Sequence, residues 1–150
     1  MNEKWMIRFM RVAKEVGSWS KDPSSKIGAV IVNENRRILA TGYNGFPKTI
    51  ADDDRLNVKE EKYPLIIHAE MNAILNALKN GVPVDGATIF VYGLPVCSEC
   101  AKSVSQSGIS KVVVMQPDEN SRWFSEWTKK SLPLFQESNI KVEYLLDADI

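Results

Sequence analysis

Residues 68–115 read HAEMNAILNALKNGVPVDGATIFVYGLPVCSECAKSVSQSGISKVVVM, and this stretch decides the fold class. Residues 69–79 and 97–106 have the composition of helices, and each segment is followed by glycine. The β-branched runs at 87–92 and 111–115 are typical of buried strands. Alternating helices and strands need crossover connections, so we expect a largely parallel half of a sheet here.

Upstream of this stretch the pattern changes to one helix and a hairpin. Apolar residues recur at helical spacing over residues 4–16. Residues 27–33 and 37–42 read as two strands of an antiparallel hairpin, joined by a polar turn. A long polar connection then runs from 42 to 64, and loops of this length are usually functional or disordered.

Downstream, residues 123–131 predict a helix that Pro133 kinks or restarts, and residues 141–145 predict a last strand. No repeat and no low-complexity linker divides the chain. We therefore expect one domain over residues 1–150. Its fold class is α/β, with three α/β/α layers and a mixed five-stranded sheet that carries helices on both faces.

Composition and charge exclude several classes of protein. The chain has 150 residues, of which 44% are hydrophobic and 25% charged, as in an ordinary globular domain. Nineteen basic and nineteen acidic residues balance, which argues against binding a polynucleotide. No apolar run approaches the ~20 residues that span a membrane, and two cysteines are too few for a disulfide framework. We expect a cytoplasmic protein that binds no membrane.

The rarest residues gather at two predicted helix starts. His68 and Glu70 begin one helix, and Cys97 and Cys100 begin the next. One imidazole and two thiolates suit a catalytic zinc ion, which commonly keeps a fourth position for water. Glu70 would then move the proton of that water to a substrate nitrogen. A redox role for the cysteines is the alternative, but it leaves His68 and Glu70 without a task.

The same spacing resembles the zinc-dependent cytidine and deoxycytidylate deaminases, whose signature is His-x-Glu followed by Pro-Cys-x-x-Cys. Here Val96 separates the proline from the first cysteine. The segments SKDPSSKIGAVIV (20–32), GYNGFP (42–47) and KYP (62–64) are similar to the deoxycytidylate deaminases in particular. The resemblance extends from about residue 20 to residue 116.

This resemblance implies a zinc-dependent hydrolase of the three-layer cytidine-deaminase-like fold that converts dCMP into dUMP and ammonia. The zinc ligands would be His68, Cys97 and Cys100, with one Zn²⁺ per chain because no other His or Cys remains. Glu70 would protonate N3 of cytosine and assist the departing amine.

The resemblance also implies two substrate contacts. Asn44 would hydrogen-bond the nucleotide, and the backbone N–H of Ala69 would bind the base carbonyl. The alternative for Asn44 is a turn residue with a left-handed backbone, which is common in Asn-Gly pairs.

The family further implies regulation and assembly. Many members are homo-oligomers, often hexamers, that dCTP activates and dTTP inhibits together with Mg²⁺. The corresponding effector residues here would be Gly42, Tyr43, Gly45, Phe46 and Asp53. A solvated acidic loop is the alternative for residues 52–54.

Two alternatives to this function stay open. The substrate could be dCTP, cytidine, cytosine, guanine or an RNA base, or the chain could be a non-catalytic zinc-stabilised module that binds nucleotide. Glu70 argues against the module, because a structural zinc site closes with four ligands and needs no proton shuttle.

The segment after residue 116 matches the family poorly, so the sequence assigns no phosphate-binding group. Arg122, Lys129 and Lys130 could reach a substrate phosphate or could serve surface solubility. Trp123, Phe124 and Trp127 are spaced as core or interface residues of a helix.

Overall fold

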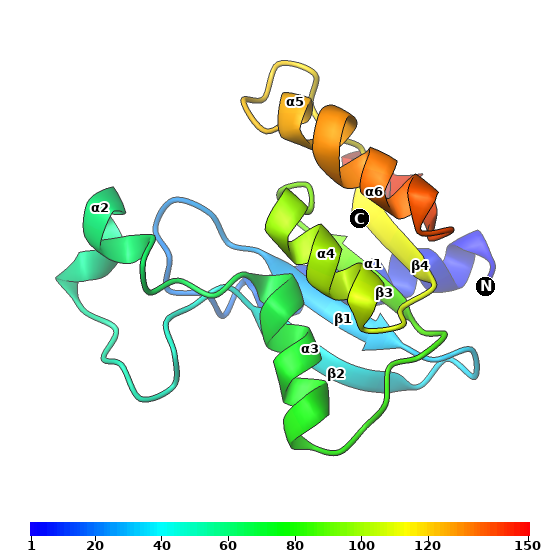
Figure 1. The fold of residues 1–150 in the computed structure, drawn as a ribbon, viewed down its shortest axis with the longest axis horizontal. Helices are drawn as coiled ribbons and strands as arrows, with labels where there is room; N and C mark the ends of the chain where they lie inside the picture. The colour runs from blue at the N-terminus through cyan, green and yellow to red at the C-terminus, as the bar shows by residue number, and fades with distance from the viewer.

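The computed structural model describes all of residues 1–150 and contains one five-stranded sheet (Figure 1). The strands are β1 (Gly28–Val32), β2 (Ile38–Tyr43), β3 (Thr88–Tyr92), β4 (Lys111–Met115) and β5 (Lys141–Leu145). Their order in the sheet is β2-β1-β3-β4-β5. β1 runs antiparallel to β2 and β3, whereas β3, β4 and β5 are parallel to one another. The predicted hairpin and the predicted parallel half are both confirmed.

Helices cover both faces of the sheet, which makes three layers. The helical elements are α1 (Glu3–Gly17), η1 (Asp54–Asn57), α2 (Lys59–Lys62), α3 (Ala69–Lys79), α4 (Ser98–Gln106), α5 (Phe124–Glu126), η2 (Trp127–Ser131), α6 (Leu132–Glu137) and η3 (Asp147–Asp149). α1 packs on one face, and α3, α4 and α6 lie on the other (Figure 1). No helix is long and apolar enough to cross a membrane.

The strand β1, which lies between β2 and β3, has all five residues buried, as expected for a strand that is covered on both faces. Its alternate side chains point to opposite layers: Val30 belongs to the cluster under α1, and Ile31 belongs to the cluster under α3 and α4. Gly28 sits where α1 crosses the strand, and a Cβ there would lie 1.8 Å from the carbonyl oxygen of Ala13. The close approach of α1 to the sheet therefore requires glycine at this position.

The structure differs from the sequence prediction in the long connection and in the last helix. The connection from residue 42 to residue 64 contains the short helices η1 and α2, which no periodicity announced. In the last helix, the turn Trp127–Ser131 is a π-helix, after which α6 continues with Pro133 in its first turn. Proline has no N–H to donate to the preceding turn, so the helix widens before it rather than ending.

Candidate active site

The candidate active site lies where the N-termini of α3 and α4 meet. His68 is the extended residue before α3, and Cys97 is the extended residue before α4. The Sγ atoms of Cys97 and Cys100 lie 3.3 and 3.4 Å from Nδ1 of His68. The ligand atoms of these three residues all lie within 4.8 Å of one another. The structure thus brings together the three residues that the sequence predicts as ligands.

This arrangement fits a zinc ion. With Zn–S bonds of about 2.3 Å and Zn–N bonds of about 2.0 Å, tetrahedral ligand atoms lie roughly 3.5 Å apart. The two measured sulfur–nitrogen distances agree with that spacing. Two sulfurs and one imidazole nitrogen form the donor set that borderline-soft zinc prefers, and three protein ligands leave one position open.

The protonation of the two cysteines also favours a bound cation. The hydrogen bond from Cys100 lowers the pKa of the Cys97 thiol, and proximity to Cys97 raises the pKa of Cys100. The Cys97 sulfur raises the pKa of His68 in the same way. A divalent cation bound between the two sulfurs would let both of them ionise.

The extra residue before the first cysteine does not disturb the ligands. Val96 is buried among the apolar residues under α4, and Cys97 still accepts a hydrogen bond from the backbone N–H of Cys100 at 3.4 Å. The first turn of α4 therefore keeps both sulfurs on the same side as His68.

Glu70 stands beside the ligands and has the properties of a proton carrier. Its side chain comes from the first turn of α3 and is buried, with 3% of the residue exposed. Burial raises the pKa of Glu70 to about 7. A carboxyl group with this pKa can both accept and donate a proton near neutral pH.

These residues open into a cavity of about 140 Å³, called the metal cavity below. Residues from five separate segments line it: Asp22, Ser24, Ser25, Ile27, Asn44, Lys59, Lys62, Tyr63, Ile66, His68, Glu70, Leu94, Pro95, Val96, Cys97, Arg122, Trp123 and Glu126. Ala69 is fully buried and is not among them, although its backbone N–H makes no hydrogen bond within the protein. The cavity is therefore polar at the metal and carries apolar walls beside it.

Asn44 lies in the wall of the metal cavity and is buried. Its Oδ1 accepts a hydrogen bond from the N–H of Ile27 at 2.9 Å, and its Nδ2 donates to the carbonyl oxygen of Ser25 at 2.8 Å. Its φ angle is not positive, so the alternative of a left-handed turn residue is wrong. The side chain ties β2 to the segment before β1.

Asn44 also belongs to a buried charged network that the sequence did not reveal. Its Nδ2 lies 3.4 Å from Oδ2 of Asp22, and Oδ1 of Asp22 accepts from Nζ of Lys62 at 3.1 Å. The Lys62 and Asp22 side chains are each only 5% exposed. A buried pair of this kind persists only when its polar atoms are satisfied, and here the N–H of Ser24 supplies a further bond to Asp22 at 2.8 Å.

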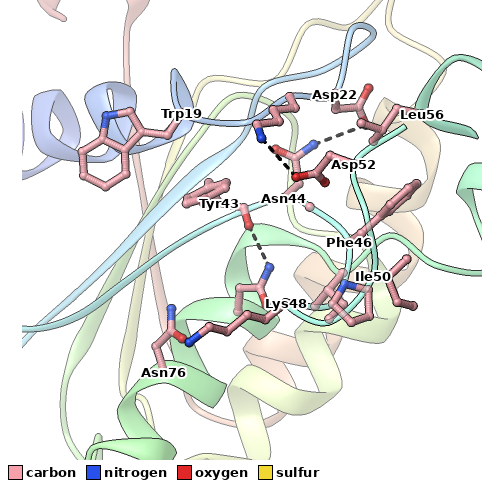
Figure 2. A pocket seen from close by; sticks show the side chains of 15 residues that line it. Trp19, Asp22, Tyr43, Asn44, Phe46, Lys48, Ile50, Asp52, Leu56 and Asn76 are labelled. Atoms are coloured by element: carbon pink, nitrogen blue, oxygen red, sulfur yellow. Dashed lines mark hydrogen bonds and ion pairs between the residues drawn. The ribbon is translucent and has the colours of Figure 1, made fainter. Parts of the chain in front are cut away.

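A second cavity of about 430 Å³ lies on the other side of Asp22 and Asn44 and is shown in Figure 2. Fifteen residues line it: Trp19, Lys21, Asp22, Tyr43, Asn44, Gly45, Phe46, Pro47, Lys48, Ile50, Asp52, Leu56, Ile67, Asn72 and Asn76. Asp22 and Asn44 line both cavities, so one layer of side chains separates them.

The predicted effector residues divide between this second cavity and other places. Tyr43, Gly45 and Phe46 line the second cavity. Gly42 instead packs against α3, where a Cβ would lie 2.3 Å from the backbone nitrogen of Ala73. Asp53 does not line the cavity, and its carboxylate accepts from Nε of Arg55 at 2.8 Å.

Among residues 52–54, the carboxylate that lines the second cavity is that of Asp52, the residue before Asp53. Asp52 accepts from Nζ of Lys21 at 3.2 Å (Figure 2). Asp53 points elsewhere because it caps η1, where its side chain accepts from the N–H of Arg55.

Sequence reasoning missed several residues of the metal cavity. Lys59, Lys62 and Tyr63 come from the long connection, which carried no periodic signal. Arg122 and Trp123 come from the segment after residue 116, where the sequence left the role of Arg122 open and predicted Trp123 as a core or interface residue. Of the three aromatic residues Trp123, Phe124 and Trp127, only Trp127 is buried in the core.

Comparison with known proteins decides the family. Residues 3–116 match the sequence profile of the cytidine and deoxycytidylate deaminase zinc-binding region. The chain belongs to this deaminase family. The resemblance in the sequence is thereby confirmed, and so are the α/β fold class and the assignment as a hydrolytic deaminase.

Two curated relatives align with different fractions of the deaminase. It is 40% identical over 148 residues to an uncharacterized deaminase in the luxG 3′ region of Aliivibrio fischeri, covering 97% of this chain and 96% of that one. It is 42% identical over 118 residues to human deoxycytidylate deaminase, covering 75% of this chain and 65% of that one. The deaminase thus spans about two thirds of the length of the human protein.

A solved structure shows the fold of the deaminase independently. The dCMP deaminase of cyanophage S-TIM5, in complex with dCMP and dUMP, superposes with a TM-score of 0.78 at 24% sequence identity. The match covers 97% of this chain and 99% of the phage chain.

Proposed function

We propose that the deaminase hydrolyses dCMP to dUMP and ammonia. The observation that carries the proposal is the union, in one cavity, of an open three-ligand metal site and the buried carboxyl of Glu70. The names of the relatives support the choice of substrate, because human deoxycytidylate deaminase is 42% identical and the phage dCMP deaminase shares the fold.

The roles of the residues follow from their chemistry. Zinc, held by His68, Cys97 and Cys100, would acidify water and so supply a nucleophile at neutral pH. Glu70 takes a proton of the attacking water and gives it to N3 as C4 gains the new bond to oxygen. Glu70 then takes the remaining proton from the new hydroxyl on C4 and gives it to the amino group. The C4–N bond breaks, ammonia leaves and C4 becomes a carbonyl, so one water is consumed and the carboxylate is regenerated.

Two further contacts orient the nucleotide in this proposal. Oδ1 of Asn44 accepts one hydrogen bond from Ile27 and keeps a second lone pair, which can accept from a sugar hydroxyl. The N–H of Ala69 is unpaired within the protein and would bind the carbonyl oxygen of the base. The side chain of Asn44 is fixed by its hydrogen bonds to Ile27 and Ser25. Ala69 is the first residue of α3, so neither group needs to move when substrate binds.

Ammonia release from a substrate panel tests the proposal. The purified protein is incubated with dCMP, dCTP, deoxycytidine, cytidine, cytosine and guanine. Turnover of dCMP far above that of the other compounds supports the proposal. Turnover of one other compound alone would show that this compound, and not dCMP, is the substrate. No turnover of any compound by zinc-loaded protein would instead favour the non-catalytic nucleotide-binding module.

A substitution at Glu70 tests the mechanism. Glu70→Gln should lower kcat by about 10²- to 10⁴-fold, the usual contribution of a general acid–base group. Zinc content should stay at one per chain, because Glu70 is not a ligand. Glu99→Gln is the matched control, since Glu99 lies between the two cysteines but is exposed and paired with Lys102. Equal activity of both variants would refute the role of Glu70.

We also propose that the second cavity binds dCTP and dTTP as activator and inhibitor. Its volume of about 430 Å³ and the lysines Lys21 and Lys48 in its lining support a nucleoside triphosphate. We propose that Mg²⁺ enters with the triphosphate, since Asp52 and Asp53 pair with Lys21 and Arg55 rather than converging on one point. A dCMP saturation curve that neither nucleotide changes would overturn this proposal.

We propose, finally, a cytoplasmic homo-oligomer, with a hexamer favoured. Leu78 on α3 is 72% exposed and Leu75 on the same helix is 38% exposed, so this helix presents apolar surface for self-association. A reducing compartment would keep Cys97 and Cys100 as thiolate ligands. Sedimentation velocity measures the assembly, and a monomer at micromolar concentration would refute it.

A further inference from the structure

The C-terminal segment forms part of the metal cavity, although the family profile ends at residue 116. Arg122, Trp123 and Glu126 all line that cavity. The segment is fixed in place from both sides. Oγ of Ser98 donates to Glu126 at 3.3 Å, and the buried indole of Trp127 donates to the hydroxyl of Tyr144 at 3.2 Å. These two hydrogen bonds connect the segment to α4 and to β5.

The charges in the lining are unevenly compensated. Three cations line the metal cavity, and Lys62 is neutralised by Asp22 at 3.1 Å. Lys59 and Arg122 make no ion pair within 4 Å. Both side chains are exposed, so they stand where the cavity meets solvent. The cavity has two positive charges that the protein itself does not use.

The acidic groups of the lining lie toward the metal. Glu70 follows the ligand His68 by two residues, and Glu126 bonds Ser98, which follows the ligand Cys97. Among the lining residues, no unpaired carboxylate therefore lies with Lys59 and Arg122 where the cavity meets solvent.

The guanidinium of Arg122 lies over an aromatic ring. Its guanidinium carbon lies 4.4 Å from the centroid of the Trp123 ring. Stacking on a ring face occupies the plane of the guanidinium and leaves its N–H groups free at the edge. That edge can bind two oxygens of a phosphate at once, which makes arginine a specific ligand for phosphate monoesters.

We infer that Arg122 and Lys59 bind the 5′-phosphate of the pyrimidine nucleotide, with Trp123 positioning the guanidinium. The inference rests on the proposed function and adds the groups that distinguish a nucleotide from a nucleoside. The phosphate is the end of the substrate that remains charged and unchanged in the reaction, so its ligands contribute binding rather than chemistry. Arg122 belongs to the segment after residue 116 and Lys59 to the long connection, so both lie outside the zinc motif.

The test compares dCMP with deoxycytidine as substrates of Arg122→Gln and Lys59→Gln. One hydrogen bond between charged groups is worth about 10- to 100-fold in affinity, so KM for dCMP should rise by about tenfold or more in each variant. Neither kcat for dCMP nor kcat/KM for deoxycytidine should change. Arg122→Lys should keep part of the affinity for dCMP, because lysine has the positive charge but lacks the paired N–H groups of the guanidinium.

Arg8→Gln is the matched control. The guanidinium of Arg8 lies 4.5 Å from the centroid of Trp5, close to the 4.4 Å of Arg122 over Trp123, but Arg8 lies on α1 and lines neither cavity. This variant should leave both substrates unaffected. Zinc content and circular dichroism of every variant confirm that the fold is intact.

The outcomes separate this inference from the proposed function. A wild-type enzyme that prefers dCMP, with variants that lose the preference, supports both. If wild type deaminates dCMP and the variants keep its KM, the phosphate site is refuted and the function stands. If wild type deaminates only deoxycytidine or cytidine, the proposed substrate fails and the phosphate site fails with it.

Discussion

The metal cavity and the second cavity use Asp22 and Asn44 in common, yet they are built from different kinds of segment. The metal cavity is centred on two helix N-termini, which fix His68 and the cysteines within hydrogen-bonding distance of one another. The second cavity is formed mainly by the chain from Trp19 to Lys21 and from Tyr43 to Leu56, which is mostly loop. The groups proposed to react thus lie at the starts of helices, whereas the lining of the second cavity consists mostly of loop residues.

This difference suggests a division of tasks. Reaction geometry tolerates errors of only a fraction of an ångström, so its groups belong on rigid elements. A loop-built cavity can adapt its shape to a ligand that need not react. The predictions that follow separate effects confined to one cavity from effects on both, beginning with the largest.

Removal of one metal ligand should abolish activity and leave the second cavity intact. Cys100→Ala deletes a sulfur that lies 3.4 Å from Nδ1 of His68, so two ligands remain for zinc. We expect less than stoichiometric zinc by elemental analysis and no measurable ammonia release. Binding of dCTP by calorimetry should persist. Full zinc occupancy in this variant would show that the three-ligand site is wrong.

Breaking the shared wall should destabilise the whole protein and disturb both cavities. Lys62→Met leaves the carboxylate of Asp22 buried without its cation, a change that costs about 3–5 kcal/mol in comparable cases. Chemical denaturation measures the loss in the free energy of unfolding. The control is Lys102→Met, because the Lys102–Glu99 pair is 58% and 80% exposed and should contribute at most about 1 kcal/mol. Equal losses would mean that the buried pair has no special role.

The two glycines of the Gly-Tyr-Asn-Gly segment should respond differently to alanine. A Cβ on Gly42 would lie 2.5 Å from the carbonyl oxygen of Ala69, in the helix that follows His68. Overpacking of this kind costs about 1–3 kcal/mol, so Gly42→Ala should lower both stability and activity. Gly45→Ala meets nothing nearer than 3.8 Å and should be stable. An unchanged melting temperature for Gly42→Ala would contradict the packing role.

A pH-dependent stability effect is expected far from both cavities, at the edge strand β5. Partial burial of Glu143 opposes ionisation, but Lys141 and Lys111, each 3.0 Å away, outweigh it and hold its pKa below the ordinary value of 4.5. A lowered pKa in the folded state stabilises the protein above the unfolded-state pKa and loses this effect as pH falls through the folded-state pKa.

Glu143→Gln should therefore reduce the free energy of unfolding at pH 7 by no more than about 1 kcal/mol. The difference from wild type should shrink as the pH falls below about 4.5. Thermal unfolding followed between about pH 3 and pH 7, the range in which carboxyl groups titrate, measures this difference. A difference that stays constant across this range would assign the effect to packing rather than to charge.

Most of the fold was predictable because its elements carry strong local patterns. The segment 111–115 is a β-branched run and the segment 69–79 has helical composition, and both were predicted with the bounds that the structure has. The short helices η1 and α2 were missed because they are only four residues each and depend on tertiary contacts. The π-turn at 127–131 was missed because it differs from an α-helix by a single residue.

The site was predictable only where chemistry coincides with a motif. The four residues that the motif predicted are rare or charged and stand at helix starts, so their spacing was enough to predict one shared site. They are His68, Glu70, Cys97 and Cys100. The burial of Lys62 was not predictable, because its partner Asp22 is 40 residues away in sequence. The place of Asp52 rather than Asp53 in the second cavity depends on which carboxylate caps η1, and sequence spacing does not decide between adjacent residues.

The single layer of side chains between the cavities also limits how this enzyme can diverge. Asp22 and Asn44 present one set of atoms to two different spaces, so a substitution that suits a new ligand on one side alters the other side as well. Residues that face only one cavity are free of this double requirement. New substrate preferences should therefore arise first at positions such as Arg122 and Trp123, and laboratory selection for altered substrates should recover changes there before it recovers changes in the shared wall.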